Sequence, residues 1–364
     1  MNSKPKTKNS KLVAALLDWF AANARDLPWR RTRDPYAIWI SEIMLQQTQV
    51  KTVIPFWTRW LRELPTIEAA ANAPSEKIHK LWEGLGYYTR VRNLQKAAQV
   101  IVEKYDAKFP EKFDDVLALP GIGRYTAGAI CSIAFNQSKP ILDGNVIRVL
   151  TRIFGIAENP KEKQTNTRLW QLAEELVKHS SLVTHHSSLS CSHLNQSLME
   201  LGALICTPRN PKCEFCPVKT LCLAFKENRV DELPNLGKRE AAIARRFVAF
   251  VIEHKGKFLV RQRPAGIVNA HLWEFPNAEV GARLCEPQQV VAEFNVLRVT
   301  DPRSVKLEPL CTVKHSITRY RMTLEAFHVR LKNSPKKLAG VWLLPKEFDS
   351  LAFSSAHKKL ASLL

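Results

Sequence analysis

A change of hydrophobic pattern near residue 245 is the feature that most constrains the fold of this chain. Residues 12–225 carry apolar side chains at helical spacing. The stretch RRFVAFVIEHKGKFLVRQRP instead alternates apolar and polar residues around Lys255-Gly256, which is typical of a β-hairpin. We therefore predict a multidomain protein of class α and α+β, with an all-helical domain at 12–225 and an α+β domain at 245–364.

Local signals subdivide the rest of the chain. Asp34-Pro35 predicts a helix start, because Asp caps free N–H groups and Pro fits the first helical position. The helical period then continues through YAIWISEIMLQQTQVKTVIPFW, residues 36–57. The Ser/His-rich segment 179–193 lacks a regular ligand spacing and is predicted to be a surface loop. Two further segments are a predicted flexible basic tail and a predicted linker, residues 1–11 and 226–244.

The charge of the chain indicates the class of its partner. Over 364 residues the formal net charge is +20, and such a positive field concentrates polyanions, of which nucleic acid is the commonest. An anionic membrane surface is the alternative. The stretch LVAALLDWFAA is too short to span a bilayer and is interrupted by Asp18. We expect a cytoplasmic, bacterial protein that does not enter a membrane.

Four of the eight cysteines are crowded into one segment and predict a metal site in a reducing compartment. Six, two and five residues separate them, and the segment also carries Arg209, Lys212 and Lys219. Four soft sulfur ligands suit either zinc or a 4Fe–4S cluster, and the spacing alone leaves both open. We expect a structural role, in which a basic loop is held against a phosphate backbone. The four are Cys206, Cys213, Cys216 and Cys222.

Two carboxylates stand in apolar surroundings. Glu42 has Ile38, Trp39 and Leu45 at helical spacing, so it is either partly buried with a raised pKa or a solvated helix residue. Asp143, within KPILDGNVIRVL, is either a simple turn and N-cap residue or an anion kept charged by a helix N-terminus. One protonated and one ionised carboxylate is the pairing that cleaves glycosidic bonds.

Three motifs occur in a fixed order: LPGIGRYTAG (119–128), ILDGNVIRVL (141–150) and the cysteine segment (206–222). Together they resemble the helix-hairpin-helix DNA glycosylases that carry an iron–sulfur cluster, and within them the MutY-type adenine DNA glycosylases. The resemblance also includes residues 25–50, 81–94 and 194–217, so it covers nearly the whole chain.

The resemblance implies one 4Fe–4S cluster on the four cysteines and a base-excision-repair activity. Such an enzyme removes adenine mispaired with 8-oxoguanine, or with guanine, from double-stranded DNA, and we expect it to act as a monomer. The adenine must first be flipped out of the duplex. By similarity Glu42 is the acid that protonates adenine, Asp143 stabilises the oxocarbenium ion, and Asn145 orients this centre. Tyr125 stands where lyase relatives carry lysine, which implies base removal without strand cleavage.

The resemblance also implies residues that contact DNA. Gln47 would wedge into the vacated stack and Tyr87 would insert beside the lesion, although a solvated helix face and a core aromatic are the alternatives. The hairpin glycines Gly121 and Gly123 would let backbone N–H groups approach a phosphate. The implied adenine pocket consists of Arg25, Leu27, Trp29, Arg30 and Gln196.

The second domain resembles the MutT-like (Nudix) fold, including LWEFP at 272–276. The following segment, NAEVGARLCEPQQVVAEFNV, lacks the glutamate cluster that holds magnesium in the pyrophosphatases of that fold. We therefore interpret the domain as a recogniser of 8-oxoguanine. His315 would contact the lesion unless it is a buried structural histidine, and Lys314 replaces a serine common in the family.

Two other functions remain as alternatives. An endonuclease III-like glycosylase and lyase for oxidised pyrimidines needs a lysine amine, which Tyr125 cannot supply. A non-catalytic iron–sulfur DNA-binding protein would leave Glu42 and Asp143 without a role.

Overall fold

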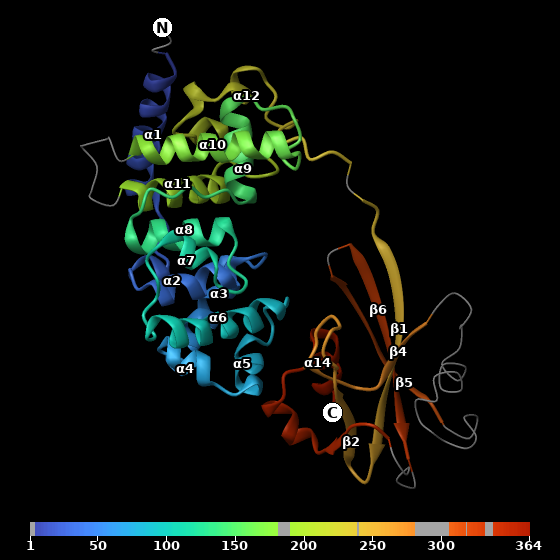
Figure 1. Cartoon of the computed structure of the whole chain (residues 1–364). Coiled ribbons are helices and arrows are strands. Elements are labelled where there is room, and N and C mark those ends of the chain that lie inside the picture. Colours follow the sequence, from blue (N-terminus) through green and yellow to red (C-terminus); the bar gives the residue numbers. More distant parts are fainter. Residues whose placement is uncertain (1–3, 181–189, 239, 281–305, 318, 332–337) are drawn as a thin grey trace. The chain divides into compact units, whose positions relative to one another are not determined.

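The chain divides into two compact units that do not follow the chain order. The first comprises Met1–Asn72 and Asn93–Arg239, and the second Ala73–Arg92 and Glu240–Leu364. No sequence pattern indicated that residues 73–92 group with the C-terminal region, and the domain boundaries expected from the sequence stay a prediction. The computed structural model (Figure 1) describes residues 4–180, 190–238, 240–280, 306–317, 319–331 and 338–364.

The first unit is helical, as the 3.6-residue period predicts. Short 3-10 turns, η1 (Pro28–Arg30), η2 (Cys213–Phe215) and η3 (Lys219–Leu221), connect some of its helices. Its helices are α1 (Lys4–Asn23), α2 (Pro35–Leu45), α3 (Val50–Glu63), α4 (Ile67–Asn72), most of α6 (Thr89–Tyr105), α7 (Phe113–Leu117), α8 (Arg124–Phe135), α9 (Gly144–Phe154), α10 (Lys163–Ser180), α11 (Ser190–Leu204) and α12 (Leu223–Lys226).

Two predicted irregular segments are helical instead. Helix α1 already begins at Lys4, so the predicted flexible tail is wrong from that residue on; lysine favours helix, and Asn9 is buried. The predicted loop at 179–193 is wrong at both ends, because α10 extends to Ser180 and α11 begins at Ser190. Cys191 in that first turn is buried, and residues 181–189 lie outside the described part.

The helix predicted through residues 36–57 is interrupted. Asp34 caps α2 as expected, its carboxylate accepting from the N–H groups of Tyr36 and Ala37. The helix then ends at Leu45, Gln47 adopts a left-handed φ of 58°, and α3 begins at Val50. Neither Gly nor Pro marks this break, so the apolar period runs across it in the sequence.

Helix α8 forms the centre of the first unit. Figure 1 shows it between α11 and α2, and both pack against it. Residues from Thr126 to Ala134 are all buried. Helices α9 and α11 approach closely at Gly202, where an added Cβ would lie 2.7 Å from the Cβ of Asn145. The fold thereby fixes the start of α9 against its neighbours.

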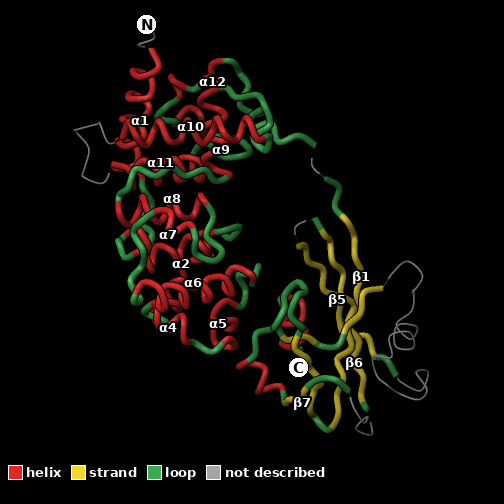
Figure 2. Tube along the Cα trace, in the orientation of Figure 1, coloured by secondary structure: helices red, strands yellow, loops and turns green. Residues whose placement is uncertain are grey.

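The second unit is built on a twisted sheet (Figure 2). Its described strands run in the order β3-β2-β1-β6-β5, and β4 pairs with β1 and β7 with β2. The predicted hairpin is confirmed: β1 and β2 pair antiparallel, and the turn residues Lys255 and Gly256 have φ values of 50° and 74°. The unit comprises α5 (Ser75–Trp82), β1 (Ile243–His254), β2 (Lys257–Gln262), β3 (Trp273–Glu274), β4 (Asn277–Val280), β5 (Glu308–Ile317), β6 (Tyr320–Arg330), β7 (Val341–Leu343) and α14 (Ser355–Ala361).

Candidate active site and cysteine loop

A cavity of about 500 Å³ opens in the first unit. It brings together residues from η1, from α2 and the break after it, and from α8, α9 and α11. Ten residues that the sequence analysis selected line it, although they are far apart in the chain: Arg25, Leu27, Trp29, Arg30, Glu42, Gln47, Tyr125, Asp143, Asn145 and Gln196.

Glu42 is a buried acid that accepts a hydrogen bond from Tyr125. Its residue surface is 5% exposed, and the Tyr125 hydroxyl donates to its Oε2 at 2.9 Å. Burial raises the pKa of Glu42 from 4.5 to about 7, although the bond from Tyr125 opposes the rise. This confirms the expected partly buried face. Burial also raises the pKa of Tyr125 well above 10.0, so its hydroxyl keeps its proton at neutral pH.

Asp143 occupies the predicted N-cap of α9. The Val146 N–H donates to its Oδ1 at 2.7 Å, and the Asn145 side-chain amide donates to its Oδ2 at 3.1 Å. The pKa of Asp143 is nevertheless raised, because burial outweighs these bonds and the charge of Arg148. The sequence predicted a carboxylate kept anionic by the helix N-terminus, and burial of Asp143 opposes that effect. The charge of Asp143 in turn disfavours ionisation of Glu42.

Glu200, in α11, is a site residue that the sequence analysis missed. Its side chain is 1% exposed and accepts from Arg25 Nε at 2.7 Å and from Arg30 Nη2 at 3.0 Å. Burial alone would raise the pKa of Glu200, but bonds from both guanidinium groups lower it to about 2. Arg30 also donates to the Gln196 side chain at 3.1 Å. Glu200 therefore holds two of the predicted pocket residues in place.

Arg148 ties the start of α9 to the cysteine loop. Its guanidinium donates to Asn145 Oδ1 at 2.9 Å, to the Gly202 carbonyl at 2.8 Å and to the Cys206 carbonyl at 2.7 Å. Because Asn145 donates to Asp143, a continuous set of hydrogen bonds connects the Cys206 backbone with the Asp143 carboxylate.

The two hairpin glycines differ in whether the packing around them requires glycine. Gly121 has a φ of 77°, and an added Cβ would collide with the Asn93 side chain, so the fold itself demands glycine there. Gly123 caps α8 with a φ of −95°, and an added Cβ would meet no protein atom within 4 Å. The packing of the described residues gives no reason for glycine at 123.

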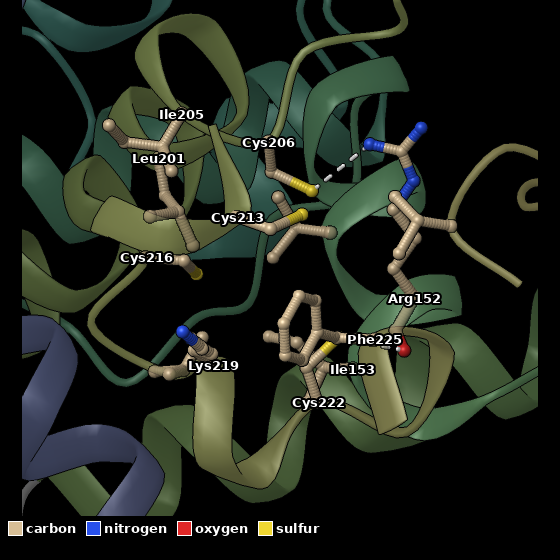
Figure 3. Close-up of a pocket in the computed structure, with 13 residues that line it drawn as sticks. Arg152, Ile153, Leu201, Ile205, Cys206, Cys213, Cys216, Lys219, Cys222 and Phe225 are labelled. Atoms are coloured by element: carbon tan, nitrogen blue, oxygen red, sulfur yellow. Dashed lines mark hydrogen bonds between the residues drawn. The ribbon is translucent and has the colours of Figure 1, made fainter. Parts of the chain in front are cut away.

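The four clustered cysteines line one largely apolar pocket (Figure 3) together with Arg152, Lys219 and Phe225. The Arg152 guanidinium donates to Cys206 Sγ at 3.4 Å. Burial raises the pKa of Cys216 to about 12 and also raises the pKa values of Cys213 and Cys222. Thiolates are therefore stable here only with a compensating cationic group, which is the chemistry of a soft-metal site.

Among the described residues, no three His, Cys, Asp or Glu side chains are grouped so that they could hold a metal ion. Each thiolate of a 4Fe–4S cluster binds a different iron, so its four ligands do not converge on one point. The four thiols of this pocket suit a soft metal or an iron–sulfur cluster. Lys219, expected to face a phosphate backbone, pairs with Glu214 instead, whereas Arg209 and Lys212 are exposed.

The remaining selected residues lie in the second unit. Tyr87, 42% exposed, precedes α6 with a left-handed φ of 47°. His315 is half-buried on β5, where burial and the charge of Lys359 lower its pKa, while Lys314 points to solvent. Glu274, in the LWEFP stretch, is buried and paired with arginines, so its charge is already neutralised. Most of the segment tested for a glutamate cluster, from residue 281 on, lies outside the described residues.

Comparison with known proteins decides the family. A model of the HhH-GPD superfamily of base excision DNA repair proteins matches residues 40–175, and the adenine DNA glycosylase of Mus musculus is 35% identical over 95% of this chain and 76% of its own length. The chain belongs to the adenine DNA glycosylases. It is 39% identical to the adenine DNA glycosylase of Buchnera aphidicola subsp. Schizaphis graminum, over 74% of this chain and 76% of that protein.

Further matches cover individual regions of this adenine DNA glycosylase. Models of the iron–sulfur binding domain of endonuclease III and of the NUDIX domain match residues 206–222 and 247–363. A solved thermostable thymine-DNA glycosylase aligns at 32% identity with a TM-score of 0.54, over 61% of this chain and 98% of that one. The predicted fold class and enzyme class are confirmed. Every helix in the described residues is too short or too polar to cross a bilayer.

We predict that Glu200→Gln destabilises the protein by about 3 kcal/mol at neutral pH, because it leaves two guanidinium groups without their buried partner. The folded-state pKa of Glu200, about 2, lies below the ordinary 4.5, so its stabilising contribution is complete above pH 4.5 and declines as pH falls toward 2. Urea unfolding of wild type and variant across this range measures the difference.

Glu63→Gln is the matched control. Glu63 pairs with Arg62 on the surface, where the two side chains are 37% and 71% exposed, so its loss should change stability by no more than about 0.5 kcal/mol. Equal effects of the two substitutions would contradict the assigned importance of the Glu200 pairs.

Proposed function

We propose that this enzyme hydrolyses the N-glycosidic bond of adenine mispaired with 8-oxoguanine or guanine in double-stranded DNA, without lyase chemistry. One observation carries the proposal: a buried carboxyl group with a pKa of about 7, Glu42, shares a cavity of about 500 Å³ with a second carboxylate, Asp143. At neutral pH an acid with this pKa is partly protonated, so it can give a proton to a departing base. The net charge of +20 supports a polyanionic substrate.

Asp143 is proposed to stabilise the cationic sugar that forms as adenine leaves. The bonds from Val146 N–H and Asn145 fix both of its oxygens, so the carboxylate is held in one orientation. Asn145 acts here as the orienting group. The charge of Asp143 favours the protonated form of Glu42, so the two carboxyl groups are suited to opposite protonation states.

Absence of an amine nucleophile supports a monofunctional reaction. No lysine is among the described residues that line the cavity. The Tyr125 hydroxyl, at the position where lyases carry lysine, instead donates to Glu42. We therefore assign Tyr125 to positioning the acid.

Recognition of the flipped adenine is assigned to the wall of the cavity. Leu27 and Trp29 are buried apolar surfaces, and the Gln196 amide is presented by its bonds to Arg30 and Ser192. Arg25 and Arg30 are occupied by Glu200, so we assign them to shaping the pocket. Gln47, on the strained turn after α2, is proposed to fill the vacated stack.

Other residues are proposed to contact the duplex outside the adenine pocket. The open space beside Gly123 suits a DNA phosphate at the start of α8, with Gly121 shaping the turn. Tyr87 is proposed to insert beside 8-oxoguanine and His315 to contact the lesion. Because arginines neutralise Glu274, we assign the second domain to recognition without pyrophosphatase chemistry.

One 4Fe–4S cluster is proposed to be bound by Cys206, Cys213, Cys216 and Cys222. The cluster would supply a rigid, soft-metal cross-link for the loop, and the exposed Arg209 and Lys212 would then face the phosphate backbone. Its assignment rests on four partly buried thiols in one pocket and on the iron–sulfur family match.

Single-turnover assays on labelled duplexes test the proposed reaction. We expect alkali-dependent cleavage of A:8-oxoguanine and A:G duplexes and none of thymine glycol. Glu42→Gln and Asp143→Asn should each slow adenine release by at least about 10²-fold while Glu63→Gln leaves it unchanged. Strand cleavage without alkali, or release of thymine glycol but not adenine, would refute the proposal. An unchanged rate for Asp143→Asn would refute its role alone.

Metal analysis tests the cluster. We expect iron and acid-labile sulfide in equal amounts, with about four of each per chain, and a visible absorption band in purified protein. Cys216→Ser should lower both contents, whereas Cys311→Ser, on β5 of the second unit, should leave them unchanged. Zinc at one equivalent without sulfide would overturn the assignment.

A further inference from the structure

The loop between α5 and α6 presents Tyr87 in an unusual backbone conformation. Gly84, Gly86 and Tyr87 have φ values of 112°, 69° and 47°, all in the region that favours glycine. An aromatic residue rarely adopts such a φ, so the surrounding contacts must hold it there. Tyr87 as a residue is nevertheless 42% exposed, so burial contributes only part of that restraint.

Two side chains fix the backbone of this loop from inside. Arg90 Nη2 donates to the carbonyl oxygens of Leu85 at 3.0 Å and Gly86 at 3.2 Å. The Trp82 indole N–H donates to the same Gly86 carbonyl at 3.0 Å. Two donors thus hold one carbonyl directly before Tyr87, and the Arg90 backbone N–H holds the Tyr87 carbonyl itself at 2.9 Å.

Arg90 also contacts the ring. Its guanidinium carbon lies over the Tyr87 ring at 5.7 Å from the centroid and over the fully buried Trp82 ring at 5.2 Å. Arginine is suited to this position because its planar group stacks on aromatic faces while its N–H groups bind carbonyls in the same plane. Lysine can carry the charge but cannot make both kinds of contact.

We propose that Arg90 is a positioning residue that holds the Tyr87 ring exposed and preformed for insertion into DNA. The inference rests on the proposed function, in which Tyr87 inserts beside the lesion. An exposed ring on a mobile loop would have to be ordered during binding, and that entropy would reduce affinity. Arg90 removes this cost by ordering the loop before DNA binds. The gain in affinity is largest for the duplex against which Tyr87 stacks.

The main alternative is that Arg90 binds a DNA phosphate directly. Its Nη2 group is already bonded to two carbonyl oxygens within the loop, and burial lowers its pKa to about 10. Both features are typical of an arginine that stabilises its own loop. A phosphate contact predicts a distinct result, because removing one reduces the salt dependence of binding by about one unit of slope.

A binding cycle on the full chain tests the proposal. The affinities of wild type, Arg90→Lys, Tyr87→Ala and the double variant are measured for two duplexes with an uncleavable fluorinated adenosine, one opposite 8-oxoguanine and one opposite guanine. We expect Arg90→Lys to lower the preference for 8-oxoguanine by about tenfold, which corresponds to one or two lost contacts of this kind. In the Tyr87→Ala background the same change should have no further effect on that preference.

Lys96→Gln is the matched control, because Lys96 is an exposed cation on the same helix. It should weaken binding to both duplexes equally. Arg90→Gln, which retains one amide donor, repeats the test if the lysine variant does not fold, as judged by circular dichroism and by the visible absorption of the protein.

The results distinguish the proposed role of Tyr87 in lesion recognition from the proposed role of Arg90 in positioning it. If Tyr87→Ala leaves the preference unchanged, the proposed role of Tyr87 is wrong and that of Arg90 falls with it. If Tyr87→Ala lowers the preference but Arg90→Lys does not, or if the two effects add, only the positioning role is wrong. Equal weakening on both duplexes with a reduced salt slope would identify Arg90 as a phosphate contact and overturn the proposal.

Discussion

Glu42 is a buried carboxyl group that accepts a hydrogen bond from the Tyr125 hydroxyl. A pKa of about 7 in place of 4.5 corresponds to roughly 3 kcal/mol of lost stability for the charged form. Because the folded pKa is raised, this cost grows above pH 4.5 and is complete above pH 7. The same cavity contains a second buried glutamate, Glu200, whose pKa of about 2 reflects two arginine partners. The number of partners, and not burial alone, decides which of the two is an acid at neutral pH.

Several contacts hold Glu42 and Asp143 in their positions. Asp34 caps the helix that carries Glu42, and α8 brings Tyr125 against it. The close approach of α11 at Gly202 and the bonds of Arg148 fix the start of α9, which carries Asp143. Glu42 lies in α2 and Asp143 caps α9, so the two carboxyl groups belong to different helices. The position of α9 depends on its close packing against α11, which requires glycine at 202. A fold of this kind can keep one acid neutral beside one fixed carboxylate.

The features that could be predicted from the sequence depend on residues that are close together in the chain. Asp34 and Asp143 were recognisable as N-caps because capping needs only a few neighbouring residues, and Lys255-Gly256 marked a hairpin for the same reason. The four cysteines were visible through their spacing.

The features that were missed depend on contacts distant in the sequence. Glu200 stands in an apolar helical run, and only its position four residues after Gln196 suggested a shared face. The break after Leu45 carries neither Gly nor Pro. The grouping of residues 73–92 with the C-terminal region left no local signal either.

The most direct test of this account is a titration of the Glu42 carboxyl group itself. Carbon-13 NMR of glutamate-labelled protein, with the signal assigned by its loss in Glu42→Gln, reports the protonation of each carboxyl group as pH changes. We expect Glu42 to titrate near pH 7, and higher still in Tyr125→Phe, which lacks the hydrogen bond that favours the ionised form. Titration near the ordinary 4.5 would contradict the account, because Glu42 would then be ionised at neutral pH and unable to protonate adenine.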